Sequence, residues 1–243
     1  RAVVCNIEMP AGVLLDRLLA RLAGIDLTDV RRRRLGPEHA DRVDQGVNTL
    51  AALADRLAFV RPPFDLDNVA ATADAVGADL VVLDYIQRIA PPGQHADRRG
   101  SVDACMSHIR RFADAGAAVV VVSAVGRSKD GQGRNSYAGD GLNLASFRES
   151  SELEFGADDA FILAPDPEAG EDVVVLKHLK ARNGEAVDLR LAFDRRHQSF
   201  TPAAAAAGPA PGERQRLRST LASLWTRTAP APAGDGDESG GDI

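Results

Sequence analysis

Four short, continuously apolar runs that alternate with helix-like segments constrain the fold of this chain most strongly. The runs lie at Ala2–Ile7, Leu57–Val60, Leu80–Asp84 and Ala117–Ala124. A continuous apolar run is typical of a strand that is covered on both faces in a parallel sheet, whereas a half-exposed strand alternates apolar and polar residues. The order predicts an α/β fold, with a mostly parallel twisted sheet flanked by helices and right-handed crossovers.

The segments between these runs predict helices. They are expected at Ala11–Ala23, Pro37–Arg56, Asp67–Val76 and Val102–Ala115. Proline at position 37 suits a first helical turn. Asp67 is the residue type that caps a helix N-terminus with its side chain.

The sequence changes character beyond the fourth run. Residues Gly126–Asn143 form a long polar stretch, and a loop of that length in a compact domain is functional or disordered. A further strand is expected at Asp158–Ala164. After it, two alternating segments flank Asn183-Gly184, a pair typical of a tight hairpin turn. We therefore expect antiparallel strands or a hairpin at the C-terminal edge of the sheet, with Lys180 and Arg182 close to the hairpin tip.

Length and composition divide the chain into one domain and three short segments. A chain of 243 residues that is 44% hydrophobic can bury one sizeable core, which we place at residues 1–200. An Ala/Pro linker at 201–212 and an amphipathic helix at 213–227 are expected to follow it. An acidic, disordered tail is expected at 228–243. Because the chain opens on Arg1 and runs at once into a strand, we expect it to be a fragment.

Several functional classes are disfavoured by composition. The net charge of −6 argues against wholesale binding of a polyanion, although a local basic patch remains compatible with it. Two cysteines, Cys5 and Cys105, indicate no disulfide framework and fit a reducing, cytoplasmic compartment. No apolar run approaches the roughly 20 residues of a membrane span. The five histidines lack metal-ligand spacing.

Two carboxylates follow core strands directly. Asp84 ends its strand at the carboxyl edge, where open α/β sheets bind ligands. It can cap the next segment, or it can hold the water shell of a Mg²⁺ ion. Glu8 ends the first strand, where it can favour a helix N-terminus or polarise a water molecule beside the metal.

Basic residues near the C-terminal strands could meet phosphate. Lys180 and Arg182 are two residues apart and share one face of a strand. They can bind phosphate, including that of a neighbouring molecule, or they can protect a sheet edge from pairing. Arg148, Glu149 and the loop residue Arg127 fit either a nucleic-acid backbone contact or an ordinary surface. Aromatic residues make up only 5% of the chain, so base stacking is not expected to dominate strand binding.

The order of these pieces resembles the DnaB-type replicative helicases, the superfamily 4 ring motors with a RecA-like fold. The resemblance covers roughly Arg1–Phe200, and its most specific parts are "LDYIQ", "RES…ADD" and "K-x-R-N-G". It implies an ATP-hydrolysing DNA helicase of replication that uses Mg²⁺. It also implies a homo-oligomeric, hexameric ring on single-stranded DNA, with a primase or a loader as further partner and no membrane association.

The resemblance also implies roles for single residues. Glu8 matches the catalytic glutamate that polarises the attacking water, and Asp84 matches the Walker B aspartate that holds Mg²⁺ through water. Ser123 ends the fourth core strand and is expected to lie near the nucleotide. Lys180 and Arg182 match finger residues that reach the nucleotide of the neighbouring subunit.

The predicted contacts to single-stranded DNA are Arg148 and Glu149, which match a channel loop of the family. Arg127, in the preceding polar stretch, is a further predicted contact.

Three departures from the family pattern bear on activity. The chain contains no G-x-x-x-x-G-K-[ST] phosphate loop, which in the family precedes the Glu8 strand, so this chain alone is not expected to hydrolyse ATP. Ala124 stands where the family has a phosphate-sensing glutamine, and Ser151 stands where it has a glycine. Two alternatives therefore stay open: a non-hydrolysing RecA-like module that binds DNA or assembles with partners, and another RecA-like ATPase such as a recombinase or a plasmid replication protein.

Overall fold

The computed structural model describes most of the chain up to Ala203. The described residues are 1–91, 98–125, 128–129, 135–136, 143, 147, 151–166 and 168–203. The chain divides into two units, Arg1–Ala203 and Ala204–Ile243. The second unit lies outside the described residues, so the amphipathic helix, the acidic tail and most of the linker stay predictions.

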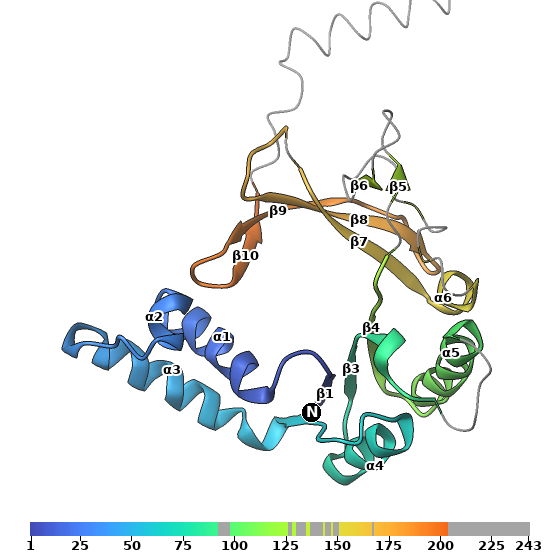
Figure 1. The fold of residues 1–243 in the computed structure, drawn as a ribbon, viewed down its shortest axis with the longest axis horizontal. Helices are drawn as coiled ribbons and strands as arrows, with labels where there is room; N and C mark the ends of the chain where they lie inside the picture. The colour runs from blue at the N-terminus through green and yellow to red at the C-terminus, as the bar shows by residue number, and fades with distance from the viewer. Residues whose placement is uncertain are drawn as a thin grey trace, which may run out of the picture. The chain divides into compact units, whose positions relative to one another are not determined.

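A four-stranded parallel sheet forms the centre of the first unit (Figure 1). Its strands run in the order β2-β1-β3-β4, and all neighbouring pairs are parallel. This confirms the predicted α/β class. The strands comprise β1 (Ala2–Asn6), β2 (Leu57–Phe59), β3 (Leu80–Asp84) and β4 (Ala118–Val122).

The main core lies between this sheet and two helices, α4 (Leu66–Val76) and α5 (Arg98–Asp114). Alternate residues of β1 and β3 enter it, which gives both strands the same alternating burial. Cys5 and Cys105 are free thiols buried in this core, and burial raises the pKa of each to about 11. The apolar runs therefore supply the core as their composition predicted.

Strand β4 departs from the prediction of strands covered on both faces. Val120 is 50% exposed and Val122 is 43% exposed. Val119 and Val121, which point the other way, pack against the main core. Among the described residues, core packing thus covers one face of this strand only, and the prediction is wrong for the other face.

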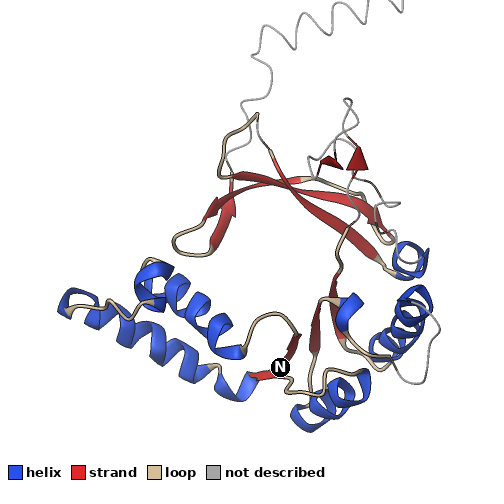
Figure 2. Ribbon diagram, viewed as in Figure 1, coloured by secondary structure: helices blue, strands red, loops and turns tan. Residues whose placement is uncertain are grey.

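A second helical layer consists of α1 (Ala11–Ala23), α2 (Leu27–Arg31) and α3 (Ala40–Ala52). Helices α1 and α3 run side by side (Figure 2). They approach closely at Gly46, where an added Cβ would lie 2.9 Å from Leu19 Cδ1. Among the described residues, no helix is long and apolar enough to cross a membrane.

Two helix predictions need correction. The expected helix over Pro37–Arg56 is three pieces, with short 3-10 turns at Pro37–His39 and Ala54–Arg56 flanking α3. The N-cap of α4 is Asp65 rather than Asp67, because Asp65 is extended and its side chain accepts a hydrogen bond from Asn68 N at 2.8 Å. A cap needs that non-helical backbone, which a residue inside the first turn lacks.

The C-terminal strands form an antiparallel sheet of their own, in the order β10-β9-β8-β7. Within the described part of the chain, this sheet shares no ladder with β4. The prediction of antiparallel C-terminal strands is thus confirmed, and the separate sheet is a detail that the sequence pattern did not predict. The strands are β7 (Asp159–Pro165), β8 (Val173–Ala181), β9 (Leu189–Asp194) and β10 (Ser199–Pro202).

The predicted hairpin at Asn183-Gly184 forms between β8 and β9, but its turn is wider than the tight one expected. The ladder between β8 and β9 closes at the pair Leu176–Leu189, well before that dipeptide. Strand β8 instead continues along β7, where Lys180 lies opposite Ala160. Lys180 and Arg182 therefore lie close to the tip of this hairpin, as predicted, and Lys180 also lies beside β7.

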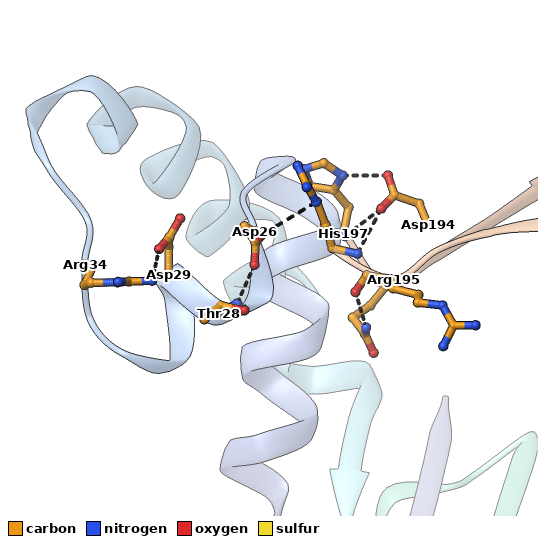
Figure 3. A network of polar contacts seen from close by, with 9 residues as sticks. Asp26, Thr28, Asp29, Arg34, Asp194, Arg195 and His197 are labelled. Atoms are coloured by element: carbon orange, nitrogen blue, oxygen red, sulfur yellow. Dashed lines mark hydrogen bonds and ion pairs between the residues drawn. The ribbon is translucent and has the colours of Figure 1, made fainter. Parts of the chain in front are cut away.

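The turn between β9 and β10 contacts the second helical layer (Figure 3). Leu27 N donates to Arg196 O at 2.8 Å, and Arg196 Nε lies 4.0 Å from Asp26 Oδ2. Asp26 also caps α2 by accepting from Thr28 N at 2.7 Å, and that hydrogen bond lowers the pKa of its carboxyl. One aspartate thus serves both the helix start and the contact with the antiparallel sheet.

Shortening a buried side chain in the central strand β3 should destabilise the fold strongly. Leu83 in β3 is fully buried, so Leu83→Ala should lower the free energy of unfolding by roughly 2–5 kcal/mol through lost burial and a cavity. Chemical denaturation of the 243-residue chain measures this loss. The matched variant Leu53→Ala, at a residue 38% exposed, should cost much less, and equal losses would contradict the assignment of the core.

Candidate functional site

Two carboxylates meet where β1 and β3 end. The register places Asn6 opposite Asp84, and Ile7 N donates to Asp84 O at 3.0 Å. Asn6 Nδ2 donates to Asp84 Oδ2 at 2.6 Å, while Asn6 Oδ1 accepts from Met9 N at 2.7 Å. Asn6 therefore links the carboxylate of Asp84 to the turn that contains Glu8.

The charge of Glu8 acts on the carboxyl of Asp84. Burial raises the pKa of the Asp84 carboxyl, the charge of Glu8 raises it further, and the hydrogen bond from Asn6 opposes the rise. Asp84 is half-buried, whereas Glu8 is exposed. The structure thus brings the two predicted site residues together at one sheet edge, in unequal environments.

An open hollow of about 540 Å³ adjoins Glu8. Its lining includes Glu8, Pro10, Phe59, Arg61 and Phe64, which come from the ends of β1 and β2 and the start of α1. No cluster of three or more His, Cys, Asp or Glu side chains suited to a metal occurs among the residues that the structure describes. The hollow therefore offers one carboxylate and one guanidinium beside apolar walls.

Ser123 and Ala124 follow β4 and are held by Gln87. Gln87 Nε2 donates to Ser123 Oγ at 2.8 Å and to Ala124 O at 3.3 Å. Its Oε1 accepts from Ala124 N at 3.2 Å. Gln87 belongs to the 3-10 turn η3 (Ile86–Arg88) just after Asp84. One side-chain amide thus fixes the end of β4 against the end of β3.

Lys180 and Arg182 lie at the antiparallel sheet, against the end of α6 (Ser151–Gly156). Lys180 Nζ and Arg182 Nη2 donate to the same carbonyl, Phe155 O, at 3.0 and 3.3 Å. Arg182 Nε also forms an ion pair with Asp158 Oδ1 at 3.0 Å. The two cations share one face, as their spacing indicated, and they gather at α6 rather than beside Asp84.

The predicted DNA contacts Arg127, Arg148 and Glu149 lie outside the described residues. Helix α6 begins at Ser151, directly after that segment. Leu153 of this helix is buried in the main core. The chain is thus anchored immediately after the predicted DNA-binding segment.

The sequence patterns did not single out three polar residues of these clusters: Asn6, Gln87 and Asp158. Asn6 had a usable signal, since it lies two residues before Glu8 in a strand paired with that of Asp84. Gln87 and Asp158 lie in the motifs "LDYIQ" and "ADD". Their partners are distant in sequence, so only the fold shows what they hold.

One comparison with known proteins identifies a family. The family model for the DnaB-like helicase C-terminal domain matches residues 1–202. No curated protein matches the chain in sequence.

Two solved structures resemble the chain in fold. The first, described as an ATPase domain, matches with a TM-score of 0.73 and 17% identity, over 84% of this chain and 74% of that one. The second, described as a DnaB-like replicative helicase and its interactions with primase, matches with a TM-score of 0.74 and 17% identity, over 84% of this chain and 50% of that one. At that identity the likeness shows the fold alone.

Proposed function

The chain belongs to the DnaB-like helicase C-terminal domain family, and on that premise we propose that it is the motor domain of an ATP-dependent DNA helicase of replication. It acts in the cytoplasm as a ring of identical subunits, six in number, that hydrolyses ATP with Mg²⁺ and translocates on single-stranded DNA. The observation that supports this best is the meeting of Glu8 and Asp84 at the carboxyl edge of the parallel sheet.

The two carboxylates suit separate tasks in phosphoryl transfer. Asp84 is half-buried and oriented by Asn6, so it can hold the water shell of a Mg²⁺ ion in a fixed place. Glu8 is exposed beside the hollow, where it can accept a hydrogen bond from an attacking water. A bound Mg²⁺ supplies neutralisation of charge on the phosphate oxygens. Ser123, held by Gln87 next to this edge, completes the nucleotide side of the proposed site.

The proposed finger residues are Lys180 and Arg182, which reach the nucleotide of the neighbouring subunit. Their position at the antiparallel sheet, away from Asp84 in sequence and element, suits a role in trans. Arg127, Arg148 and Glu149 are the proposed contacts to the DNA backbone. A primase or a loader is a proposed partner, since one structural neighbour is described with its primase interactions.

A second candidate function is a non-hydrolysing RecA-like module that binds DNA or assembles with partners. The observation that favours it is Ala124, whose methyl group cannot hydrogen-bond phosphate and whose backbone groups are engaged by Gln87.

Hydrolysis by the protein expressed from its complete reading frame separates the two candidates. We expect ATP hydrolysis that depends on Mg²⁺ and rises with added single-stranded DNA, together with unwinding of a forked duplex. Phosphate release and strand displacement measure these activities. DNA binding without hydrolysis would overturn the helicase proposal and support the second candidate.

A further inference from the structure

Three cations from two elements converge on the turn that follows α6. Lys180 lies near the end of β8 and Arg182 directly follows it, while Arg110 comes from α5. Besides the contacts to Phe155 O, Arg110 Nη1 donates to Gly156 O at 3.4 Å. A helix C-terminus presents carbonyl groups without helical partners, which cations stabilise. The turn therefore binds three cationic side chains of its own subunit through its carbonyl oxygens.

Asp158 adds a negative charge to this turn and pairs with two of the cations, Arg110 and Arg182. Its Oδ1 lies 3.0 Å from Arg182 Nε and 3.6 Å from Arg110 Nη1, and its backbone oxygen accepts from Arg182 N at 2.9 Å. Asp158 thus contacts Arg182 through both its side chain and its main chain. These contacts hold the main chain of Arg182 and the Nε side of its guanidinium group in place.

Nη1 of Arg182 is the guanidinium nitrogen that can meet another anion. In the described residues, the contacts of its guanidinium group use Nε and Nη2. A guanidinium group is a rigid planar fork, so holding one edge orients the other. These contacts leave the two N–H donors of Nη1 for a further acceptor, in a side chain that is 43% exposed.

We propose that Asp158 is a positioning residue for Arg182, which it holds in place to meet the nucleotide phosphate of a neighbouring subunit. This inference rests on the proposed function. Arginine has high side-chain entropy, and a preset orientation removes part of the cost of ordering it in the transition state. Asp158 acts through Arg182 and is not itself a catalytic residue.

The carbonyl groups of Phe155 and Gly156 and the side chain of Asp158, here called the anchor of Arg182, also connect Arg182 to the core of its own subunit. Helix α6 places Leu153 in the main core, and Arg110 belongs to α5, which packs on the parallel sheet. The same helix begins directly after Arg148 and Glu149, the proposed DNA contacts.

A pair of adjacent aspartates tests the proposal. Asp158 and Asp159 have side chains that are 50% and 52% exposed, but Asp159 pairs with His178 at 3.0 Å instead of with a finger residue. In the protein from the complete reading frame, Asp158→Asn should lower kcat for ATP roughly 10-fold, with KM within about twofold. Asp159→Asn should stay within about twofold of wild type. Asp158→Glu, which restores the charge, should recover part of the loss.

A spectroscopic measurement on the 243-residue chain checks the anchor directly. The Nε–H resonance of Arg182 should exchange slowly with water in the wild type and in Asp159→Asn, and fast in Asp158→Asn. Both aspartate side chains are half-exposed, and asparagine keeps a polar group at each position, so all variants should melt close to wild type.

The possible results distinguish failure of the positioning role from failure of the proposed helicase function. A wild-type protein without hydrolysis would overturn the proposed function, and the positioning role with it. An active wild type with an unchanged or raised kcat in Asp158→Asn would overturn the positioning role alone. A raised value would indicate that Asp158 competes with the nucleotide for Arg182. Equal losses in both asparagine variants would also contradict it.

Discussion

Replacing Glu8 with glutamine should abolish DNA-stimulated ATP hydrolysis in the protein expressed from its complete reading frame, while ATP binding persists. Loss of a positioned general base costs roughly 10²- to 10⁴-fold in rate. Glutamine keeps the size of the side chain but not its charge, so the hollow beside β1 and the turn held by Asn6 should keep their shape. Phosphate release measures hydrolysis, and a fluorescent ATP analogue measures binding.

Two further measurements make this prediction specific. Glu171→Gln, at an exposed position in the turn before β8, should hydrolyse ATP like the wild type. In the 243-residue chain, Glu8→Gln should also lower the pKa of Asp84, followed by NMR of its carboxyl carbon, because the charge of Glu8 raises it. Burial, the larger cause, stays and keeps the pKa above that of an exposed aspartate. Unchanged turnover would exclude Glu8 as the base.

The parallel sheet could be predicted from the sequence because its cause is local. Val81 and Leu83 are buried in a strand whose apolar run has no competing pattern, and Asp84 ends it as expected. Helix α1 was predicted with its exact residues, Ala11–Ala23, since apolar spacing and a following left-handed Gly24 both end it there. Where local preference and tertiary pairing agree, the sequence suffices.

The features that could not be predicted depend on pairing at long range. The Asn183-Gly184 turn lies between β8 and β9 as predicted, but the ladder that would make it tight stops at Leu176–Leu189, and the pairing of Lys180 with Ala160 of β7 had no local signal. The cap of α4 is set by the extended backbone at Asp65, although two aspartates fit the pattern. Local propensity is a weak prior in both cases, because tertiary contacts override it.

Part of the candidate site could likewise be predicted from the sequence, and part of it depends on long-range pairing. The proximity of Glu8 and Asp84 follows from parallel strands ending at one edge, so the sequence could indicate it. That Asn6 joins them depends on register, because a one-residue shift would place its amide on the other face. The anchor of Arg182 needs a helix end, a strand end and a second helix together, and no single stretch of sequence contains that combination.

Replacing Arg182 with alanine should inactivate rings that contain both mutant and wild-type subunits. A finger supplied in trans stabilises transition-state charge and is worth roughly 10³- to 10⁵-fold in rate. Arg182 directly follows β8 of the antiparallel sheet and pairs with Asp158, so its loss should leave the nucleotide site of the same subunit intact. Arg182→Ala alone should therefore bind ATP and form rings, yet hydrolyse it little.

Mixing the subunits distinguishes a finger in trans from one in cis. If hydrolysis must pass around a ring of six, an equal mixture should retain roughly 2% of the wild-type rate, whereas independent subunits would retain about half. Arg190→Ala is the matched control, because Arg190 is also half-exposed and pairs with Asp166 at 3.1 Å within the same sheet. Its mixtures should follow composition in proportion. Strict proportionality for Arg182→Ala as well would place each finger at the nucleotide of its own subunit and remove the coupling between neighbours on which ordered translocation depends.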